Sequence, residues 1–263
     1  MGKRSEYKNG TFCWPELATS DTDKAKEFYS EVMGWTTTDM PLECGGYYSM
    51  WQLGEDVIGA MYKLVDDQIK QNIPPHWIGY VSVDSIEETI KKINSLNGKI
   101  LMGPADVGDA GRMAFVQDPQ GANFALWQGL NNKGASLVND PGSLCWNELA
   151  TKDIEAAKSF YCGVFGWTVQ TDDSVDHQYT VFYNGEAMAG GMMEMTEEWG
   201  DMPPHWMIYF SVKDTDRQCE VIEKSGGNVC VPPMDIDNIG RFAVVNDPQG
   251  ATFSIIDLNS PDP

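Results

Sequence analysis

The chain contains few basic residues, histidines or cysteines. Its 263 residues include 39 Asp and Glu but only 18 Lys and Arg, which gives a formal net charge of −21. A protein this acidic repels nucleic-acid phosphates and anionic membranes, so neither is expected as a partner. The six cysteines form no Cys-x-x-Cys pair and are too sparse for a disulfide scaffold, so we expect small, buried thiols.

Long apolar runs are also missing. No stretch approaches the roughly 18 apolar residues that a membrane span requires, and residues 1–10 are polar and charged, unlike a secretion signal. The sequence therefore predicts a soluble, cytoplasmic protein. A Gly-x-Ser-x-Gly elbow and a glycine-rich phosphate loop are absent as well, which argues against the corresponding hydrolases and nucleotide-binding proteins.

A duplication extends over the whole chain. Trp-Pro-Glu-Leu-Ala-Thr at 14–19 returns as Trp-Asn-Glu-Leu-Ala-Thr at 146–151, an offset of 146 − 14 = 132. Further matches follow at an offset of 205 − 76 = 129: residues 74–77 with 203–206, Arg112 with Arg241, and 118–122 with 247–251. We therefore predict two similar domains, 1–133 and 143–263, joined by a linker at 134–142.

Each half has the pattern of two βαβββ modules. In the opening strand, the period of two places Trp14 and Glu16 on one face. A helix follows, with Ser20 or Asp21 as its N-cap and Gly34 as its left-handed C-terminal stop. The predicted fold class is α+β, with four modules paired as an internal pseudo-dimer. The pairing within one chain is compatible with a monomer or a homodimer.

The ordered landmarks resemble the vicinal oxygen chelate superfamily, which includes glyoxalase I, extradiol dioxygenases and bleomycin-resistance proteins. The resemblance rests on Trp-x-Glu-Leu-x-Thr-x-Asp, on Phe-Tyr-x-x-x-x-Gly-Trp, and on Gly-Arg before Asp-Pro-x-Gly-Ala, in both halves. It implies tandem glyoxalase-like domains, each formed by two βαβββ modules that curl around a concave cleft. Enzymes of the superfamily commonly hold one divalent metal in that cleft.

The metal-ligand positions implied by the resemblance do not carry ligands here. The first position, fourteen residues before the Phe of Phe-Tyr, is Trp14 in one half and Trp146 in the other. The last position falls on Ala125 and Ser254. Indole and alanine cannot bind a metal, and serine is a poor ligand for zinc or iron. We therefore predict no metal and no other cofactor in either half.

The predicted cleft lining is aromatic and polar. Glu16 and Glu148 are the candidates for a general base, because burial raises the pKa of a carboxyl group. The other reading of these two residues is a buried carboxylate paired with backbone donors or with the arginines. The other reading of the tryptophans is that they pack in the core. The other reading of the histidines is that each begins a strand and forms its hydrogen bond with the backbone. The predicted ligand-binding residues are Trp14, Glu16, His76, Arg112, Asn123, Trp127, Trp146, Glu148, His205, Arg241 and Ser254.

Three functions remain compatible with the sequence. The first is a metal-independent protein of the bleomycin-resistance kind that binds a small aromatic or amphipathic molecule. The second is a metal-free enzyme of the isomerase or lyase type that uses Glu16 or Glu148 as its base. The third, a metal-dependent lyase or dioxygenase, is disfavoured by the missing ligands. We expect one of the two clefts to be functional, with the first, richer in tryptophan, slightly favoured.

Overall fold

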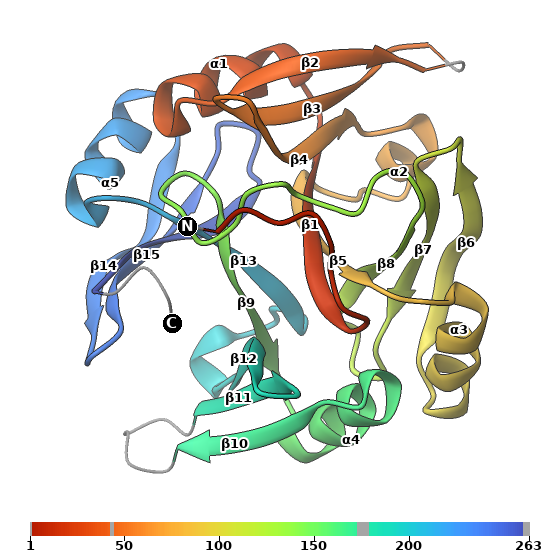
Figure 1. The fold of residues 1–263 in the computed structure, drawn as a ribbon. Helices are drawn as coiled ribbons and strands as arrows, with labels where there is room; N and C mark the ends of the chain where they lie inside the picture. The colour runs from red at the N-terminus through yellow and green to blue at the C-terminus, as the bar shows by residue number, and fades with distance from the viewer. Residues whose placement is uncertain (1, 43–44, 173–178, 260–263) are drawn as a thin grey trace.

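The computed structural model describes residues 2–42, 45–172 and 179–259, and it contains two eight-stranded sheets, one in each half of the chain (Figure 1). The strand order is β2-β3-β4-β1-β5-β8-β7-β6 in the first sheet and β10-β11-β12-β9-β13-β16-β15-β14 in the second. The two orders correspond strand for strand. The predicted tandem α+β architecture, with two βαβββ modules in each domain, is confirmed.

The first domain is built from eight strands and three helices. Its elements are β1 (Thr11–Thr19), α1 (Thr22–Met33), β2 (Thr36–Pro41), β3 (Tyr47–Leu53), β4 (Asp56–Lys63), α2 (Asp66–Lys70), β5 (His76–Ser82), α3 (Ile86–Ser95), β6 (Lys99–Val107), β7 (Gly111–Gln117) and β8 (Asn123–Gly129).

The second domain repeats this order, with a short 3₁₀ helix in place of α2. Its elements are β9 (Leu144–Thr151), α4 (Ile154–Phe165), β10 (Thr168–Asp172), β11 (Tyr179–Asn184), β12 (Ala187–Glu194), η1 (Glu197–Trp199), β13 (His205–Ser211), α5 (Thr215–Lys224), β14 (Asn228–Ile236), β15 (Gly240–Asn246) and β16 (Thr252–Leu258).

The first helix of each domain begins and ends at matching residues. Asp21 caps α1 by accepting a hydrogen bond from the backbone N–H of Lys24, and Asp153 caps α4 in the same way. Gly34 and Gly166 end these helices with φ of 69° and 74°, a left-handed conformation that glycine adopts without a steric cost. Both stops agree with the sequence pattern, and Asp21, rather than Ser20, is the cap.

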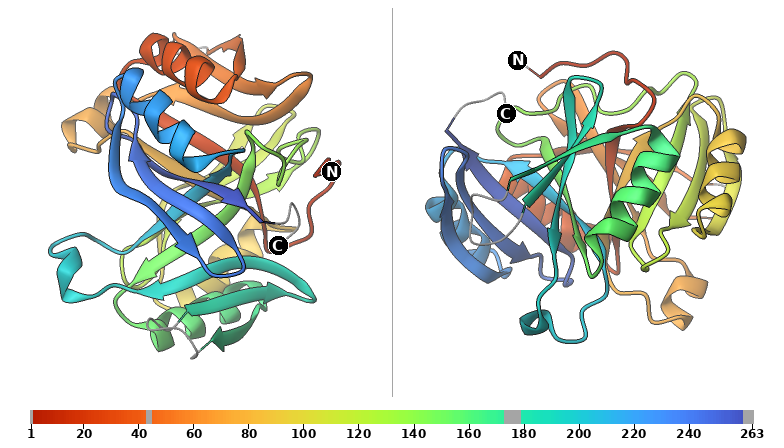
Figure 2. Two further views of the ribbon diagram at one scale, coloured as in Figure 1. Left: turned by 90° about the vertical axis from the view of Figure 1, so that its left-hand side faces the viewer. Right: turned by 90° about the horizontal axis from the view of Figure 1, so that it is seen from below.

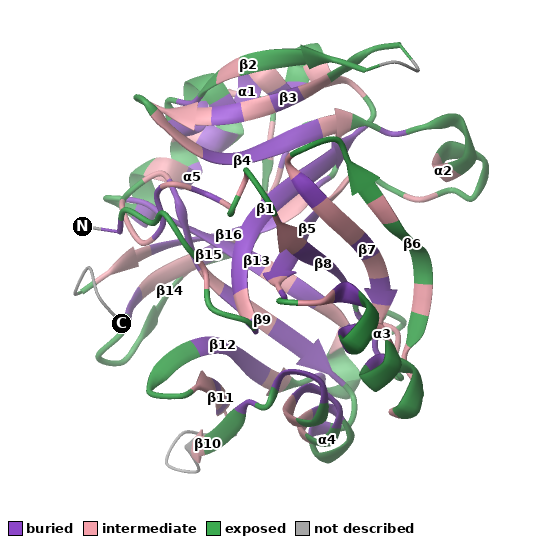
Figure 3. Cartoon of the chain, turned by 45° about the vertical axis from the view of Figure 1, so that its right-hand side comes forward, coloured by how far each residue is buried: buried purple, intermediate pink, exposed green. Residues whose placement is uncertain are grey.

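The two faces of each sheet differ in what covers them. In the first sheet, Trp14 is paired with Tyr80 and Glu16 with Ile78, so these side chains lie on one face, which we call the inner face. The opposite, outer face carries Trp77, which packs against Tyr29 of α1. The central strands β1 and β5 are buried, and the edge strand β6 is exposed (Figure 3).

The outer faces of the two domains share their hydrophobic cores. One core combines Trp35 and Trp77 of the first domain with Phe210 and Phe253 of the second, and another combines Phe124 with Phe160. The helices accordingly lie in two interdomain pairs, α1 with α5 and α3 with α4 (Figure 2). This packing makes the chain an internal pseudo-dimer. The first core also extends to Trp14 and Tyr80 of the first inner face.

The segment between the domains is ordered and packed. We call residues 130–143, between β8 and β9, the connecting segment. Its Ala135 N–H donates to the carbonyl of Cys13 at 2.8 Å, and Leu137 forms an antiparallel bridge with Lys3. Leu137 and Val138 are buried in the core that contains Trp14. The predicted linker is therefore an integral part of the first domain's packing.

The structure also addresses the predictions that the cysteines are buried thiols and that no segment spans a membrane. Cys13, Cys145, Cys162, Cys219 and Cys230 are free thiols, and Cys44 lies outside the described residues. Cys13, Cys145 and Cys219 are buried as expected, whereas Cys162 is only partly buried and Cys230 is exposed. Over the described part of the chain, every helix is too short or too polar to cross a membrane.

Candidate functional site: two Trp–Glu–Tyr–Tyr clusters

A hydrogen-bonded cluster lies on the inner face of the first sheet. The hydroxyl of Tyr48 donates to Oε2 of Glu16 at 2.5 Å, and the hydroxyl of Tyr80 donates to Oε1 at 2.7 Å. The indole Nε1 of Trp14 donates to the Tyr48 hydroxyl at 3.3 Å. We call these four residues the first cluster. Each oxygen of the Glu16 carboxylate thus accepts one tyrosine hydroxyl.

The second sheet carries an equivalent cluster. Glu148 accepts hydrogen bonds from Tyr179 and Tyr209, each at 2.8 Å, and Nε1 of Trp146 donates to the Tyr179 hydroxyl at 3.0 Å. We call these four residues the second cluster. Since β9 and β1 are sequence repeats, the same alternation places tryptophan and glutamate two residues apart on the inner face in both domains.

Burial shifts the titration of the glutamates and tyrosines. It raises the pKa of Glu16 and of Glu148 above the ordinary value of 4.5, and the tyrosine hydroxyls partly offset that rise because they bind the charged form better. Burial, together with the neighbouring carboxylate, raises the pKa of Tyr48 and of Tyr80 well above 10.0. The tyrosines therefore remain protonated donors across the physiological pH range.

The closing strands of the sheets complete the inner faces. In β8, Ala125 is paired with Tyr80, and the ring of Trp127 lies 6.4 Å from that of Tyr80. The amide of Asn123, at the start of β8, accepts a hydrogen bond from Gln117. In β16, Ser254 is paired with Tyr209. The structure thus brings Trp127 and Ser254 beside the clusters, and it leaves the exposed Asn123 at the end of its strand.

The two histidines are turned towards the backbone. Nδ1 of His76 lies 2.8 Å from the carbonyl oxygen of Pro74, and Nδ1 of His205 lies 2.9 Å from that of Pro203. Burial lowers the pKa of His76 and so favours its neutral form. His76 is paired with Ala18, at the other end of β5 from Tyr80, so it belongs to the inner face but takes no part in the hydrogen bonds of the first cluster.

The arginines lie on the other face of their sheets. Arg112 forms ion pairs with Glu87 of α3 at 2.6 Å and with Asp106 at 2.8 Å. Arg241 binds Asp216 of α5 and Asp235 in the same manner. The sequence places both arginines in the lining of the cleft, whereas the structure places them on the opposite face from the two clusters. Alternation along β7 points Met113 and Phe115 inward, so Arg112 must point outward.

The partners of the glutamates are the residues that the sequence analysis missed. Tyr80 and Tyr209 each follow the repeated histidine by four residues, and alternation from that histidine places them on the inner face. Tyr48 and Tyr179 recur at an offset of 179 − 48 = 131. The duplication therefore contains the second pair of tyrosines, but the two strands agree at the tyrosine alone, so sequence matching does not reveal their correspondence.

The residues of the inner faces do not fit a metal. Trp14 and Trp146 use their indole N–H groups as donors, and Ala125 has no ligating atom. Within residues 2–42, 45–172 and 179–259, no three His, Cys, Asp or Glu side chains come together in a way that could hold an ion. Glu16 and Glu148 each stand alone among tyrosines, whereas structural and catalytic zinc sites have at least three protein ligands.

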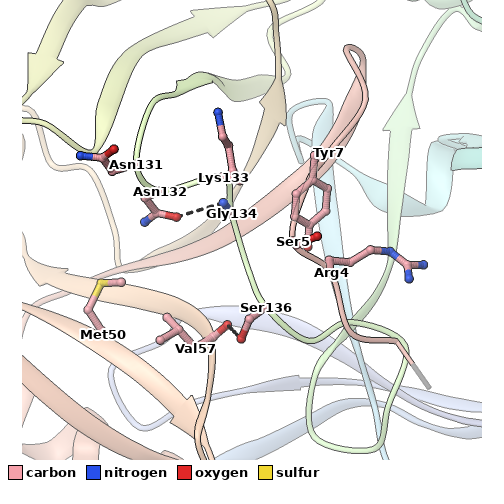
Figure 4. Close-up of a pocket in the computed structure, with 10 residues that line it drawn as sticks. All are labelled: Arg4, Ser5, Tyr7, Met50, Val57, Asn131, Asn132, Lys133, Gly134 and Ser136. Carbon is pink, nitrogen blue, oxygen red and sulfur yellow. Dashed lines mark hydrogen bonds between the residues drawn. The ribbon is translucent and has the colours of Figure 1, made fainter.

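A hollow of about 300 Å³ lies at the edge of the first inner face. Met50 of β3 and Val57 of β4 line one side, and Arg4, Ser5 and Tyr7 line the other. Residues 131–134 and Ser136 of the connecting segment lie between them (Figure 4). The backbone N–H of Ser136 donates to the carbonyl of Val57 at 2.7 Å. The connecting segment therefore occupies much of the space beside the first cluster.

Comparison with known proteins identifies the family. The model of the Glyoxalase/Bleomycin resistance protein/Dioxygenase superfamily matches residues 12–126 and 142–255. The chain belongs to this superfamily. The resemblance found in the sequence is thereby confirmed, as is its implication of one glyoxalase-like domain in each half.

Several relatives match over nearly the whole chain. The "Putative glyoxylase CFP32" of Mycobacterium tuberculosis is 40% identical over 258 residues, which cover 97% of this chain and 98% of the relative. The "Anthracycline biosynthesis protein DnrV" of Streptomyces peucetius is 30% identical over 266 residues, which cover 97% of this chain and 95% of the relative. Both matches also extend over nearly the whole length of the relative.

Solved structures show the same fold at low sequence identity. A Mn(II)-bound glyoxalase from Novosphingobium aromaticivorans has a TM-score of 0.65 at 14% identity, over 100% of this chain and 87% of that protein. The 2,3-dioxygenase LapB from Pseudomonas sp. KL28 has a TM-score of 0.64 at 13% identity, over 94% of this chain and 91% of that protein. These similarities establish the fold and not the chemistry.

Proposed function

We propose that this protein binds a small, flat aromatic molecule on an inner face and that no metal takes part. The observation that supports the proposal most is the Trp–Glu–Tyr–Tyr cluster, which stands beside the positions of the superfamily's metal ligands in both halves. An indole offers a surface for stacking, and a carboxylate offers an acceptor for a hydroxyl or amino group.

The names of the relatives suggest the chemical class of the ligand. Two relatives are named for anthracycline biosynthesis, at 30% and 29% identity. Anthracyclines contain fused aromatic rings with phenolic hydroxyls, which suit a site of tryptophan, tyrosine and glutamate. The more similar relative is named for a glyoxylase, but within the described residues no three His, Cys, Asp or Glu side chains come together at the inner faces.

A titration with 1,2-dihydroxyanthraquinone tests the proposal. We expect saturable binding, seen as a shift of the probe's visible absorbance, and weaker binding of anthraquinone, which has no hydroxyl to donate to a cluster glutamate. Absence of saturable binding for the hydroxylated probe would refute the proposed class. Equal affinity for both probes would show that the carboxylate takes no part.

The raised pKa of the cluster glutamates favours a second function, a metal-free isomerase or lyase that uses Glu16 or Glu148 as its base. A carboxyl group whose pKa is raised towards neutrality is a better proton acceptor once ionised. A turnover screen with carbonyl and phenolic substrates separates this function from binding alone. Product formation that is lost in Glu148→Gln and in Glu16→Gln would support the enzyme, and binding without product would support the first proposal.

A further inference from the structure

The two inner faces are not equally accessible. Trp14 and Glu16 are each 5% exposed, and Ile78, beside them, is 6% exposed. Their counterparts Trp146, Glu148 and Met207 are all only partly buried. The hydrogen-bond pattern is the same in both clusters, so the difference lies in what surrounds them.

In the first domain, the connecting segment closes the space beside the cluster. Ala135 is 1% exposed and packs in the core that contains Trp14. Nε1 of Trp127 donates to the carbonyl of Asn132, and the Tyr7 hydroxyl donates to the carbonyl of Ala135. These hydrogen bonds, 2.8 Å and 2.7 Å long, hold the segment at residues 132 and 135. The segment is thus anchored to the first domain by hydrogen bonds and by packing.

The second inner face carries four methionines at positions where the first domain has other residues, although the first inner face has Met50 and Met113 elsewhere. Met207 is paired with Glu148, Met193 with Tyr179, and Met188 with Tyr183, and Met234 is paired with Phe242, whose ring lies 6.3 Å from that of Tyr209. Met188 is 44% exposed and Met234 51% exposed. At the equivalent positions, the first domain has no methionine: Val57, Tyr62, Ile78 and Ala105.

The composition of this face determines what it can bind. Methionine is unbranched and polarisable, so it adapts to ligands of different outline and makes favourable contacts with aromatic rings. Below the methionines, Glu148 accepts two hydroxyl hydrogen bonds, and a carboxylate has about four acceptor sites, so it can accept further donors from a ligand. An aromatic ring can pack against the methionines while its phenolic hydroxyl donates a hydrogen bond to Glu148.

A difference in the strand beside Glu148 changes how the second cluster packs. Glu148 is paired with Gly191, whereas Glu16 is paired with Ala60. A Cβ atom at residue 191 would lie 1.9 Å from the Tyr179 hydroxyl and 2.9 Å from Nε1 of Trp146. Glycine therefore lets Tyr179 and Trp146 pack directly against the backbone of β12.

The geometry points to the inner face of the second domain as the ligand site of the chain. Resting on the proposed function, the inference is that this face alone binds polycyclic phenols, one per chain, with the four methionines as an adaptable wall and Glu148 as the hydrogen-bond acceptor. The first domain keeps its cluster as a buried structural element. A wall of this kind accepts several ring systems.

A calorimetric titration with 1,2-dihydroxyanthraquinone, combined with hydrogen exchange of the full chain, tests the inference. We expect one ligand per chain and slower amide exchange in β9, β11 and β12. Met234→Glu places a charge on the wall at an exposed position and should weaken binding about tenfold, a loss of about 1.4 kcal/mol. Met40→Glu is the matched control, since Met40 is 52% exposed on β2, and it should bind like the parent protein.

The outcomes separate the inference from the proposed function. Two ligands per chain, slower exchange in β1 and β3, or unchanged affinity in Met234→Glu would overturn the inference and leave the proposed function intact. Absence of binding to the parent protein would overturn both. Met234→Glu changes only an exposed side chain, so circular dichroism should show a parent-like fold, and a loss of affinity with that fold retained supports the methionine wall.

Discussion

The hydroxyl of Tyr29, in the first domain, donates a hydrogen bond to Oδ2 of Asp247, in the second domain, at 3.1 Å. The reciprocal bond, from Tyr161 to Asp118, is 3.0 Å long. These residues belong to the repeated Phe-Tyr and Asp-Pro-Gln-Gly motifs, so the sequence landmarks of the duplication are the contacts that join its two copies. Nε1 of Trp77 donates to the same Tyr29 hydroxyl at 2.9 Å and completes a buried chain of three groups.

Removing this hydroxyl should destabilise the whole chain. In Tyr29→Phe, the Asp247 carboxylate loses a donor and the Trp77 indole loses its acceptor, and both groups stay buried. We expect the free energy of unfolding to fall by about 1–3 kcal/mol, measured by urea denaturation. Tyr47→Phe, at a residue that is 56% exposed, is the control and should unfold like the parent. A Tyr29→Phe variant as stable as the parent would show that the interdomain bond contributes nothing.

Neither half should fold as a monomer on its own. Because each core contains side chains from both domains, residues 1–133 alone would expose Trp35, Trp77 and Phe124 to water. We expect this fragment to be unfolded or to self-associate, as judged by circular dichroism and light scattering. A folded, monomeric fragment with cooperative unfolding would contradict the shared-core account.

The pKa of Glu16 predicts a specific dependence of stability on pH. Because the pKa is raised in the folded state above 4.5, the folded protein binds the proton more tightly than the unfolded chain does. The folded state is thus favoured at low pH, and this contribution is lost as the pH rises from about 4.5 through the raised value. The Glu16→Gln variant cannot ionise, so its stability does not fall in this pH range through residue 16.

The stability of Glu16→Gln relative to the parent should therefore increase as the pH rises above about 4.5. Urea denaturation of both proteins at a series of pH values measures the difference in stability directly. The contributions of the other carboxylates are the same in both proteins and cancel. A difference that stays constant, or that changes in the opposite direction, would show that Glu16 is not destabilised by its burial.

Much of the architecture could be predicted from the sequence because the fold repeats its signals. The N-caps at Asp21 and Asp153 and the glycine stops at Gly34 and Gly166 depend on local backbone chemistry, which is legible in a short stretch of chain. Strand alternation similarly placed Trp14 with Glu16 on one face. These properties need no knowledge of distant contacts.

The site was harder to predict because its details depend on distant partners. Arg112 was assigned to the inner face from its place in a motif, yet the alternation along β7 turns it towards Glu87 of α3. Accessibility was also not predictable, since Trp14 and Trp146 have nearly the same sequence neighbours. The difference between them comes from the connecting segment and from the four methionines, which lie far away along the chain.

The second cluster should contribute a measurable share of the binding energy. In the double variant Trp146→Ala with Glu148→Gln, a ligand loses aromatic stacking of roughly 0.5–1.5 kcal/mol and a hydrogen bond to a charged group of roughly 1.5–3 kcal/mol. The affinity for 1,2-dihydroxyanthraquinone should fall by about one to three orders of magnitude, at 1.4 kcal/mol per tenfold. Unchanged affinity in a folded variant, seen by calorimetry and circular dichroism, would exclude the cluster from the binding site.

The most direct test of the account is a calorimetric titration of the full chain with 1,2-dihydroxyanthraquinone before and after exhaustive treatment with a chelator, with metal content measured by elemental analysis. The account predicts the same affinity and the same single site in both preparations, with the metal content after treatment far below one ion per chain. Binding that disappears with the chelator and returns when one equivalent of a divalent metal is added would contradict it.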